Sequence, residues 1–309
     1  MSARVDADVD TGVRPKASFV CISYNHVDFV GQCLDAFLAQ EVDFDVEIVV
    51  HDDASEDGTR DVLASYAARC PGRFRLILPE TNSGCPGHAM ATALRHARGE
   101  YVLFCDADDH WTDVRKAQTQ VDFLERHPQF AFTFHDAVRQ NRSGTLTYPM
   151  MEDAWRRNWT SAEIAEAGSL FFCQSSLCFR NVLAPYPSEL AHSPLGDVFL
   201  ARMLGHAGAG AYLGDEVRPT TSALHEGGVW SGATDEQRGD MVTLTYLNLV
   251  AWLLRVGYDD EAQRLARREL VPRLLGTHDL PAPAPPFSWR HPGSLLLIAR
   301  RRWALRYRS

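Results

Sequence analysis

Short apolar runs alternate with amphipathic helical patterns along the first third of the chain. Apolar runs that end in polar residues predict buried strands at 18–22, 46–50, 74–78 and 101–105. Apolar residues at helical spacing predict helices between these strands and after the last, with Ser55 or Asp57 as the expected cap of the second helix and Thr112 or Asp113 as that of the fourth. Strands separated by helices need crossover connections, so the pattern predicts an α/β fold whose mostly parallel sheet is flanked by helices.

Polar residues follow three of these predicted strands. Ser23-Tyr24-Asn25 follows the first strand, Asp52-Asp53 the second and Asp106-Ala107-Asp108-Asp109 the fourth. In open parallel sheets, ligands bind beyond the carboxyl ends of the strands. We therefore expect the three polar clusters to converge at one edge of the sheet.

The Asp106-Ala107-Asp108 sequence is typical of a site for a hard cation. Two carboxylates on a tight loop can face one Mg²⁺ or Mn²⁺, ions that prefer oxygen ligands and share them with substrate phosphates. A solvated turn that caps the next helix gives the same pattern, and Asp109 fits a helix start or a supporting role. The first strand is followed by no Gly-x-Gly-x-x-Gly motif, and the chain has no Walker lysine motif, which disfavours dinucleotide and P-loop sites.

The pattern is weaker after Gln140. We expect helices after Thr160, over 197–205 and over 235–273, a strand-like segment over 169–179 and a loose connector over 208–214. A proline-rich linker follows at 281–286. The tail beyond it carries six arginines beside apolar residues. It fits a docked terminal helix, which we favour, or a helix lying on an anionic membrane.

Composition narrows the class of protein. With 309 residues, 45% hydrophobic and 23% charged, the chain is typical of a globular protein. A net charge of −9 argues against nucleic acid as the main partner. No apolar run is long enough to span a membrane, and residues 1–16 lack the apolar segment of a secretory signal and are interpreted as a frayed tail. Seven scattered cysteines, an odd number, favour a reducing cytoplasm.

Taken in order, these motifs resemble the family 2 glycosyltransferases of GT-A fold. The resemblance rests on Ser23-Tyr24-Asn25, on 51–59, Asn82-Ser83-Gly84, 99–111, 116–124 and 225–231. It covers about residues 17–232. It implies an inverting transfer of a sugar from a nucleotide-diphosphate donor, with uridine as the expected base, to a hydroxyl group of a glycan, lipid-linked sugar or small metabolite.

The resemblance also implies roles for the residues of the strand ends. Asp53 is expected to bind the nucleobase, with Ser23 and Tyr24 lining its pocket. Asp106 is expected to bind the donor by facing the ribose, or to belong to the metal shell as a second ligand of the ion. Asp108 is expected to be the ligand of Mn²⁺ or Mg²⁺.

Three residues further along the chain complete the expected site. Asp197, in Gly196-Asp197, is the implied general base, and an N-cap of a helix over 198–203 is the alternative. His225 is expected to contact the diphosphate or the metal, or to be a polar loop residue. Trp230 is expected to stack on a sugar face, or to be a core residue of a closing loop.

The expected organisation has four parts: a disordered tail over 1–16, a nucleotide-sugar-binding half over 17–140, an acceptor-binding half over 141–234 and a helical extension with a basic tail over 235–309.

Two other functions fit the same residues. A nucleotidyltransferase also uses aspartates, a metal and an α/β sheet, although it is expected to carry a glycine-rich basic loop near the first strand. The second alternative is a protein that binds a sugar nucleotide but does not catalyse a reaction. We expect a cytoplasmic protein. Peripheral contact with the membrane through residues 287–309 is the alternative.

Overall fold

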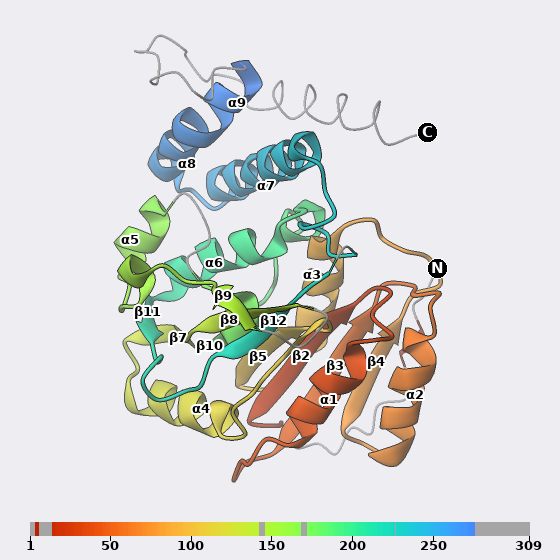
Figure 1. The fold of residues 1–309 in the computed structure, drawn as a ribbon. Helices are drawn as coiled ribbons and strands as arrows, with labels where there is room; N and C mark the ends of the chain where they lie inside the picture. Colours follow the sequence, from red (N-terminus) through yellow and green to blue (C-terminus); the bar gives the residue numbers. More distant parts are fainter. Residues whose placement is uncertain (1–3, 6–13, 142–145, 168–171, 226, 276–309) are drawn as a thin grey trace.

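The computed structural model describes residues 4–5, 14–141, 146–167, 172–225 and 227–275 (Figure 1). Its first half alternates strands and helices as the apolar pattern predicts. In chain order these elements are β2 (Ala17–Ser23), α1 (Val30–Leu38), β3 (Val46–Asp52), α2 (Thr59–Arg69), β4 (Phe74–Leu78), α3 (Pro86–His96) and β5 (Tyr101–Asp106). The strands pair in parallel in the order β4-β3-β2-β5. The predicted α/β fold with a mostly parallel sheet is confirmed.

The chain then extends the large sheet beyond β5 and forms a second, smaller sheet. The elements are β6 (Asp109–His110), α4 (Lys116–Arg126), β7 (Phe130–Phe134), β8 (Ala137–Asn141), β9 (Leu146–Pro149), α5 (Ser161–Glu166), β10 (Cys178–Arg180), α6 (Gly196–Ala207), β11 (Ala209–Tyr212) and β12 (Thr220–Leu224), with 3₁₀ turns η1 (Asp153–Trp155), η2 (Gln174–Ser176) and η3 (Leu190–His192). β10 lies antiparallel between β5 and β7, and β11 is parallel to β7. The smaller sheet has the order β6-β12-β8-β9. Because β12 pairs with β6, its end lies beside the acidic loop after β5.

The two faces of the large sheet are covered by different helices, and neighbouring residues of β2 belong to both cores. The ring of Phe19 packs against those of Phe37 in α1 and Trp111, with centroids 5.5 and 5.1 Å apart. Val20 belongs to the apolar cluster of the other face, together with Met90 of α3. Successive side chains of a strand point to opposite faces. The continuous apolar run of β2 therefore builds both cores.

A helical layer follows the sheets and packs over α6 (Figure 1). It consists of α7 (Asp235–Arg255), α8 (Asp259–Leu265), a π-helical turn over 266–270 and α9 (Val271–Leu275). The ring of Trp252 in α7 packs against that of Phe199 in α6, with centroids 5.5 Å apart. The predicted helix over 235–273 is broken at Gly257, whose φ of 88° favours glycine. Among all the residues that the structure describes, no helix has the length and apolar character needed to cross a bilayer.

The predicted caps of α2 and α4 are wrong, whereas the helix expected after Thr160 is present as α5. Thr160 caps α5 through a reciprocal capping box with Glu163. The cap of α2 is Gly58, with φ of 100°, and the cap of α4 is Arg115; neither position has a side-chain cap. The candidate residues are used elsewhere: the side chains of Ser55 and Asp57 accept hydrogen bonds from the loop after β2, and Thr112 donates to a backbone carbonyl at Pro219.

Two segments of the second half differ from their predicted structure. The loose connector expected over 208–214 contains β11, which pairs in parallel with β7. Within the described residues of 169–179, the chain forms the η2 turn and the first residues of β10 instead of a continuous strand. In both cases pairing with a distant strand decides the local structure, which short sequence windows cannot detect.

The described residues near the N-terminus contact the sheet, unlike the frayed tail predicted for 1–16. Arg4–Val5 (β1) pairs antiparallel with β4. Lys16 forms ion pairs with Glu100, at 3.0 Å, and with Glu125. The predicted linker over 281–286 and the basic tail over 287–309 lie outside the described residues.

A close approach between α3 and the segment that leads into α6 depends on Gly87. A β-carbon at Gly87 would lie 2.2 Å from the carbonyl oxygen of Ser193 and 2.4 Å from that of Leu190. Backbone atoms cannot move aside as a flexible side chain does, so α3 and η3 can approach this closely only because residue 87 has no side chain.

We predict that Gly87→Ala destabilises the protein by roughly 1–3 kcal/mol, because the added methyl group forces the two backbones apart. The matched control is Gly31→Ala in α1, where a β-carbon would meet only the Tyr66 hydroxyl at 3.7 Å. That variant should be as stable as the wild type or up to about 1 kcal/mol more stable. Urea unfolding followed by circular dichroism measures both, and equal midpoints for Gly87→Ala and wild type would contradict the prediction.

Candidate functional site

The polar ends of β2, β3 and β5 lie side by side at one edge of the large sheet, as predicted. β2 pairs with β3 up to Ser23 opposite Asp52, and with β5 up to Ile22 opposite Asp106. The turns that follow these strands therefore start next to one another. This edge brings together the side chains on which the sequence-based hypothesis depends.

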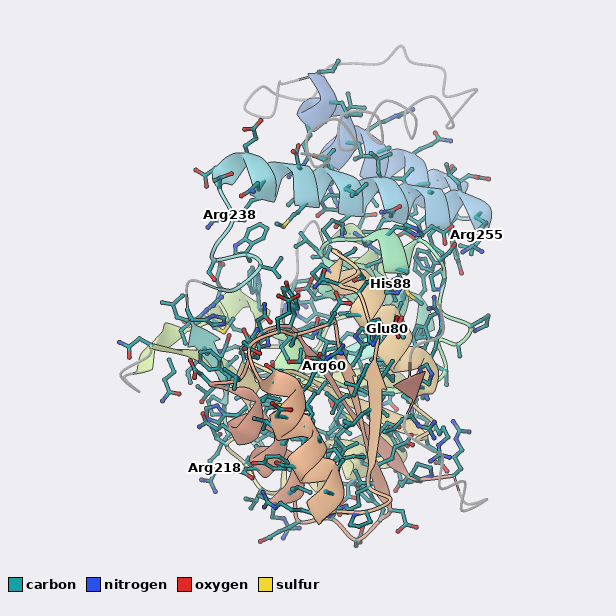
Figure 2. The ribbon with its side chains drawn as sticks, turned by 90° about the vertical axis from the view of Figure 1, so that its right-hand side faces the viewer. Arg60, Glu80, His88, Arg218, Arg238 and Arg255 are labelled. Atoms are coloured by element: carbon teal, nitrogen blue, oxygen red, sulfur yellow. The ribbon has the colours of Figure 1, made fainter. Side chains whose placement is uncertain are left out.

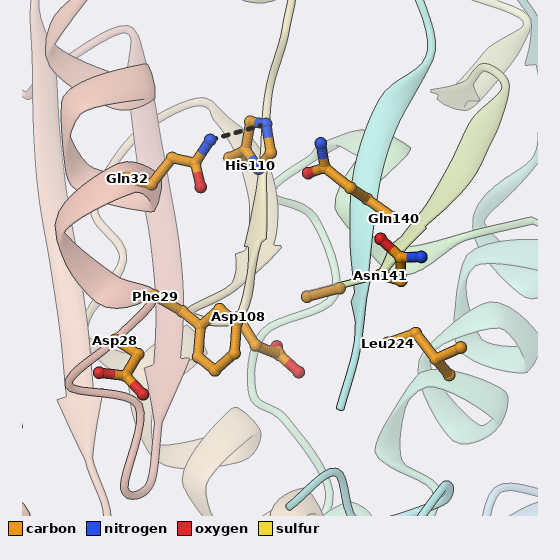
Figure 3. Close-up of a pocket in the computed structure, with 9 residues that line it drawn as sticks. Asp28, Phe29, Gln32, Asp108, His110, Gln140, Asn141 and Leu224 are labelled. Carbon is orange, nitrogen blue, oxygen red and sulfur yellow. Dashed lines mark hydrogen bonds between the residues drawn. The ribbon is translucent and has the colours of Figure 1, made fainter. Parts of the chain in front are cut away.

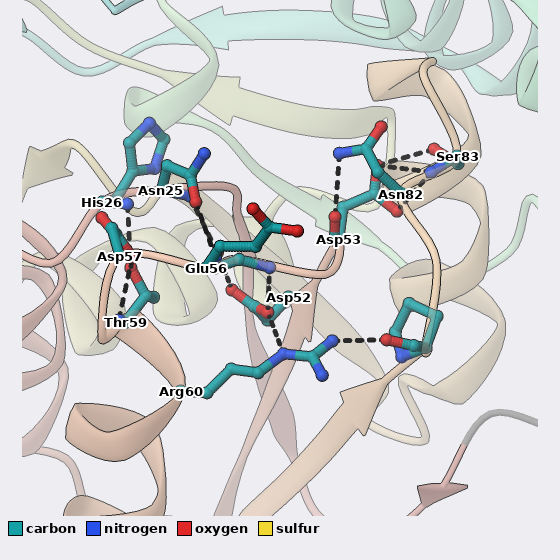
Figure 4. A network of polar contacts seen from close by, with 12 residues as sticks. Asn25, His26, Asp52, Asp53, Glu56, Asp57, Thr59, Arg60, Asn82 and Ser83 are labelled. Atoms are coloured by element: carbon teal, nitrogen blue, oxygen red, sulfur yellow. Dashed lines mark hydrogen bonds and ion pairs between the residues drawn. The ribbon is translucent and has the colours of Figure 1, made fainter.

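The turn after β3 holds the loop after β2 (Figure 4). Three successive backbone amides of the loop donate to three side chains of the turn: Asn25 to Ser55, His26 to Thr59 and Val27 to Asp57, over 2.8, 2.9 and 3.0 Å. In return, Asn25 Oδ1 accepts a hydrogen bond from the Glu56 amide at 2.9 Å. We call these four hydrogen bonds the loop clamp. The polar residues of 52–59 thus fix the backbone of a second loop.

Asp52 and Asp53 have different partners. The buried carboxylate of Asp52 forms an ion pair with Arg60 at 2.7 Å. The carboxylate of Asp53 accepts hydrogen bonds from the backbone amide and the hydroxyl of Ser83, the latter at 2.7 Å. Asn82 donates to the backbone carbonyl of Asp53 at 2.9 Å (Figure 4). Asp52 is therefore a structural residue, whereas Asp53 links the turns after β3 and β4.

Ser23 and Tyr24 lie beside Asp53 at the end of β2. The backbone amide of Asp53 donates to the carbonyl of Ser23 at 2.9 Å. The Ser23 hydroxyl is buried and has no hydrogen-bond partner within the described chain. The Tyr24 side chain is exposed. These three residues are adjacent, which the expected nucleobase pocket requires.

The first and the last aspartate of the acidic loop are bound by the turn before β10. The carboxylate of Asp106 accepts a hydrogen bond from Gln174 Nε2 at 3.1 Å. The carboxylate of Asp109 accepts one from the Ser175 hydroxyl and another, at 3.2 Å, from the amide of Ala223. Asp109, within β6, therefore supports the junction of the two sheets.

Burial and crowding disfavour the charged forms of these acids. Burial raises the pKa of Asp106 well above its ordinary value, and the negative charges of Asp108, Asp109 and Asp197 raise it further. Burial also raises the pKa of Asp109 to about 7. Several carboxylates with few positive partners lie close together here, so a cation would relieve their mutual repulsion.

Asp108 lies in a group of three potential metal ligands. His225 Nε2 is 2.9 Å from the carboxylate of Asp108. One ring nitrogen of His26 completes the group, and the three ligand atoms all lie within 4.8 Å of one another. Burial would raise the pKa of Asp108, but the hydrogen bond with His225 and the nearby imidazoles lower it overall. Burial lowers the pKa of His26, which favours the neutral imidazole that binds metals.

The rings around His225 fix its orientation. The ring of Phe29 lies 4.7 Å from that of His225, with the planes 32° apart. The ring of His26 meets it edge-on at 5.8 Å. The His225 side chain is only 5% exposed. The interpretation of His225 as an ordinary polar loop residue therefore does not describe its surroundings.

Asp197 lies in the first turn of α6. Its Oδ1 accepts a hydrogen bond from the amide of Val198 at 2.8 Å, and the N-cap position belongs to Leu195. Burial raises its pKa. The charge of Asp197 in turn raises the pKa of Asp106. The Asp197 carboxylate is thus half-buried, and it accepts a hydrogen bond from the next residue in the chain.

Trp230 lies on the loop between β12 and α7 and is exposed, so it is not a core residue. The guanidinium of Arg238, near the start of α7 (Figure 2), lies 5.6 Å from the centroid of its ring. Arg238 Nε also donates to the carbonyl of Trp230 at 3.0 Å. These contacts tie the loop to α7 and leave the Trp230 ring accessible.

A pocket of about 470 Å³ opens beside Asp108, between the start of α1 and the end of β12 (Figure 3). Its lining combines polar and apolar side chains: Asp28, Phe29, Gln32, Asp108, His110, Gln140, Asn141, Ala223 and Leu224. Gln32 and His110 are hydrogen-bonded across it at 3.1 Å. The carboxylate of Asp108 is therefore reachable from this side of the sheet edge.

Sequence reasoning identified Asp108 and His225 but assigned no role to His26. Nothing in the sequence indicates that a histidine after Ser23-Tyr24-Asn25 meets one that follows β12. In the sequence, His26 is only a single histidine beside a motif. Its role as a potential metal ligand can be recognised only in the structure, where the loop clamp holds it near Asp108 and His225. Asp106, expected as a second metal ligand, lies outside the three-residue group and instead accepts a hydrogen bond from Gln174.

Comparison with known proteins adds a family and a set of similar folds. The family described as Glycosyl transferase family 2 matches residues 18–182. An uncharacterized protein of Mycobacterium tuberculosis is 40% identical over 141 residues, which are 46% of this chain and 40% of that protein. The chain therefore spans less than half the length of this relative.

Solved structures share the fold at low sequence identity. TarS of S. aureus, residues 1–349 in complex with UDP-GlcNAc, has a TM-score of 0.61 and 21% identity over 84% of this chain and 73% of that one. The mannosyltransferase PcManGT from Pyrobaculum calidifontis, in complex with GDP-Man and Mn²⁺, has a TM-score of 0.56 and 20% identity over 98% of this chain and 84% of that one. The predicted GT-A fold is thereby confirmed.

The loop clamp is testable at Thr59, which is fully buried. Thr59→Val keeps the shape but removes the acceptor of the His26 amide, and we predict a loss of roughly 1–3 kcal/mol of stability. Thr119→Val, at a half-buried position of α4, is the matched control and should change stability by less than about 0.5 kcal/mol. Urea unfolding measures both variants, and an unchanged Thr59→Val midpoint would argue against the clamp.

Proposed function

The chain belongs to glycosyl transferase family 2, and from this membership we propose that it is a metal-dependent inverting glycosyltransferase. It takes a sugar from a nucleoside diphosphate donor and transfers it to a hydroxyl group of a glycan, lipid-linked sugar or small metabolite. One observation carries the proposal: the turns after β2 and β3, the acidic loop after β5 and His225 meet at one edge of the sheet.

Asp53 is proposed to bind the nucleobase of the donor, with Ser23 and Tyr24 beside it. The hydrogen bonds from Ser83 hold the Asp53 carboxylate in place before a ligand arrives, and the buried hydroxyl of Ser23 beside it has no partner among the described residues. We propose a uridine diphosphate sugar as the donor, because TarS has a similar fold and binds UDP-GlcNAc. Since a shared fold does not decide the substrate, GDP-Man, the ligand of PcManGT, is the alternative to be tested.

Asp108 and His225 are proposed to hold a divalent cation, Mn²⁺ or Mg²⁺. The residues fit such an ion, because three potential ligand atoms lie within 4.8 Å in a region crowded with carboxylates. When bound, the ion supplies positive charge that offsets the charge developing on the diphosphate. Asp106 is proposed to contact the ribose or the surroundings of the ion.

Asp197 is proposed to be the general base. Its carboxylate would accept the proton of the acceptor hydroxyl while that oxygen forms a bond to the anomeric carbon. The bond from that carbon to the diphosphate oxygen breaks, and the diphosphate leaves with the electron pair from the opposite face, which inverts the configuration. The raised pKa of the half-buried Asp197 makes it a stronger base than an exposed carboxylate. The exposed ring of Trp230 is proposed to stack on a sugar.

The division into a donor half over 17–140, an acceptor half over 141–234 and an extension from 235 is part of this proposal. Two other functions predict different products. A nucleotidyltransferase would form a bond to the α-phosphate and release pyrophosphate, whereas the glycosyltransferase releases a nucleoside diphosphate. A non-catalytic binding protein would bind the donor and release neither.

We predict that Asp108→Ala loses at least about a hundredfold in turnover, because it removes the carboxylate that holds the cation. The measurement is release of nucleoside diphosphate from UDP-sugars and GDP-Man with Mn²⁺ present. The control is Asp215→Ala, which removes an exposed carboxylate between β11 and β12. This variant should keep wild-type turnover. Near-normal turnover of Asp108→Ala would refute the metal role.

We predict that Asp197→Asn binds the donor with wild-type affinity but turns over about 10²–10⁴ times more slowly, because the amide cannot accept the proton. Donor binding is measured as a thermal shift, and turnover as above. Asp259→Asn, at an exposed position of α8, controls for the loss of one charge. An unchanged kcat in Asp197→Asn would remove this residue as the base.

A further inference from the structure

We propose that His26 is a third protein ligand of the cation, so that two imidazoles and one carboxylate bind it. Such a site prefers a transition-metal ion to Mg²⁺ and binds it before the donor arrives. The inference rests on the proposed function only in taking Asp108 as an ion ligand. It adds a residue from the loop after β2 to a site otherwise formed by the acidic loop and the segment after β12.

The geometry brings His26 within reach of the same ion as Asp108 and His225. The three potential ligand atoms all lie within 4.8 Å of one another. Metal bonds to imidazole nitrogen and carboxylate oxygen are about 2.0–2.2 Å long, so two ligands of one ion lie roughly 3–4 Å apart. Small rotations of the side chains would close the group to these separations.

The ring of His26 has an unused buried nitrogen. Its Nδ1 is buried and has no hydrogen-bond partner among the residues that the structure describes. Buried polar atoms are nearly always paired, and an exception needs an explanation such as an ion. In a neutral imidazole, one nitrogen carries a proton and the other has a free electron pair. A cation bound to the nitrogen with the free electron pair would give the buried ring a partner.

The backbone of His26 is fixed independently of any ion. Its amide donates to Thr59, and the next amide, of Val27, donates to Asp57 (Figure 4). Its ring is packed edge-on against Phe29, with centroids 6.3 Å apart, and against His225. A ligand held in this way loses little conformational freedom when the ion binds, which favours binding without a donor.

The donor set decides which ion is preferred. Mg²⁺ binds oxygen ligands and gives up its water molecules reluctantly. Imidazole nitrogen favours the first-row transition metals, and two histidines with one carboxylate leave positions open on an octahedral ion. Those positions are available to the oxygens of a diphosphate. The ligands of this chain therefore favour Mn²⁺ over Mg²⁺, and Co²⁺ over Mn²⁺.

The test measures ion binding to the full chain without nucleotide. Mn²⁺ is titrated by electron paramagnetic resonance, with Mg²⁺ and Co²⁺ as competitors. We expect Mn²⁺ to bind at least about tenfold more tightly than Mg²⁺, and His26→Ala to lower the Mn²⁺ affinity by about tenfold or more. His192→Ala, which removes an exposed histidine at the end of η3, should leave the Mn²⁺ affinity unchanged. The pulsed electron paramagnetic resonance spectrum of the wild-type protein with Mn²⁺ should show nitrogen couplings from two bound imidazoles.

Three results would overturn the proposal: equal Mn²⁺ affinity of His26→Ala and wild type, equal affinity of the wild type for Mn²⁺ and Mg²⁺, or nitrogen coupling from one imidazole alone. The last measurement uses unmodified protein, so it holds even where the variant fails to fold. Because neither donor nor turnover enters the test, its failure would remove His26 as a ligand and leave the glycosyltransferase proposal intact. Near-normal turnover of Asp108→Ala would instead argue against Asp108 as an ion ligand, which is the one premise that the two proposals share.

Discussion

The candidate site depends on hydrogen bonds between two turns that follow neighbouring parallel strands. The backbone amides of residues 25–27 would lose their acceptors without the side chains of Ser55, Asp57 and Thr59. Asn25 and Ala54 have positive φ values of 55° and 64°, which residues with a β-carbon rarely adopt. Backbone strain of this kind persists only where surrounding contacts impose it. The loop clamp supplies such contacts, and it fixes the start of α1 and the ring of His26.

Electrostatics explain why this edge would bind a cation. The charges of Asp108, Asp109 and Asp197 raise the pKa of Asp106, and burial removes the water that would screen these charges. Asp52, by contrast, has the guanidinium of Arg60 at 2.7 Å. Within the described part of the chain, no arginine or lysine forms an ion pair with this group of buried and half-buried carboxylates, which favours either protonation or a bound cation. Ion binding and the ionisation of these acids are therefore linked.

The fold was largely predictable because β2, β3 and β5 are almost entirely buried and appear as mostly apolar runs. The short β11 was not, because its Ala209-Gly-Ala-Tyr sequence has little β-propensity and becomes a strand by pairing with β7. The helix caps failed because Ser55 and Asp57 bind a loop from another part of the chain. The sequence pointed to Asp53, Asp106 and Asp108 through motifs, but His26 needs the contact with Asp108 to be recognised.

The two halves of the site differ in how strongly the comparisons support them. The family match ends at residue 182, before Asp197 and His225. Both residues nevertheless are held by structure that the matched part builds: the start of α6 approaches α3 at Gly87, and β12 pairs with β6 directly after the acidic loop. α7 then covers α6 from the far side, through Trp252 and Phe199. These contacts therefore place Asp197 and His225, which lie after the matched residues, toward the edge of the sheet where the acidic loop begins.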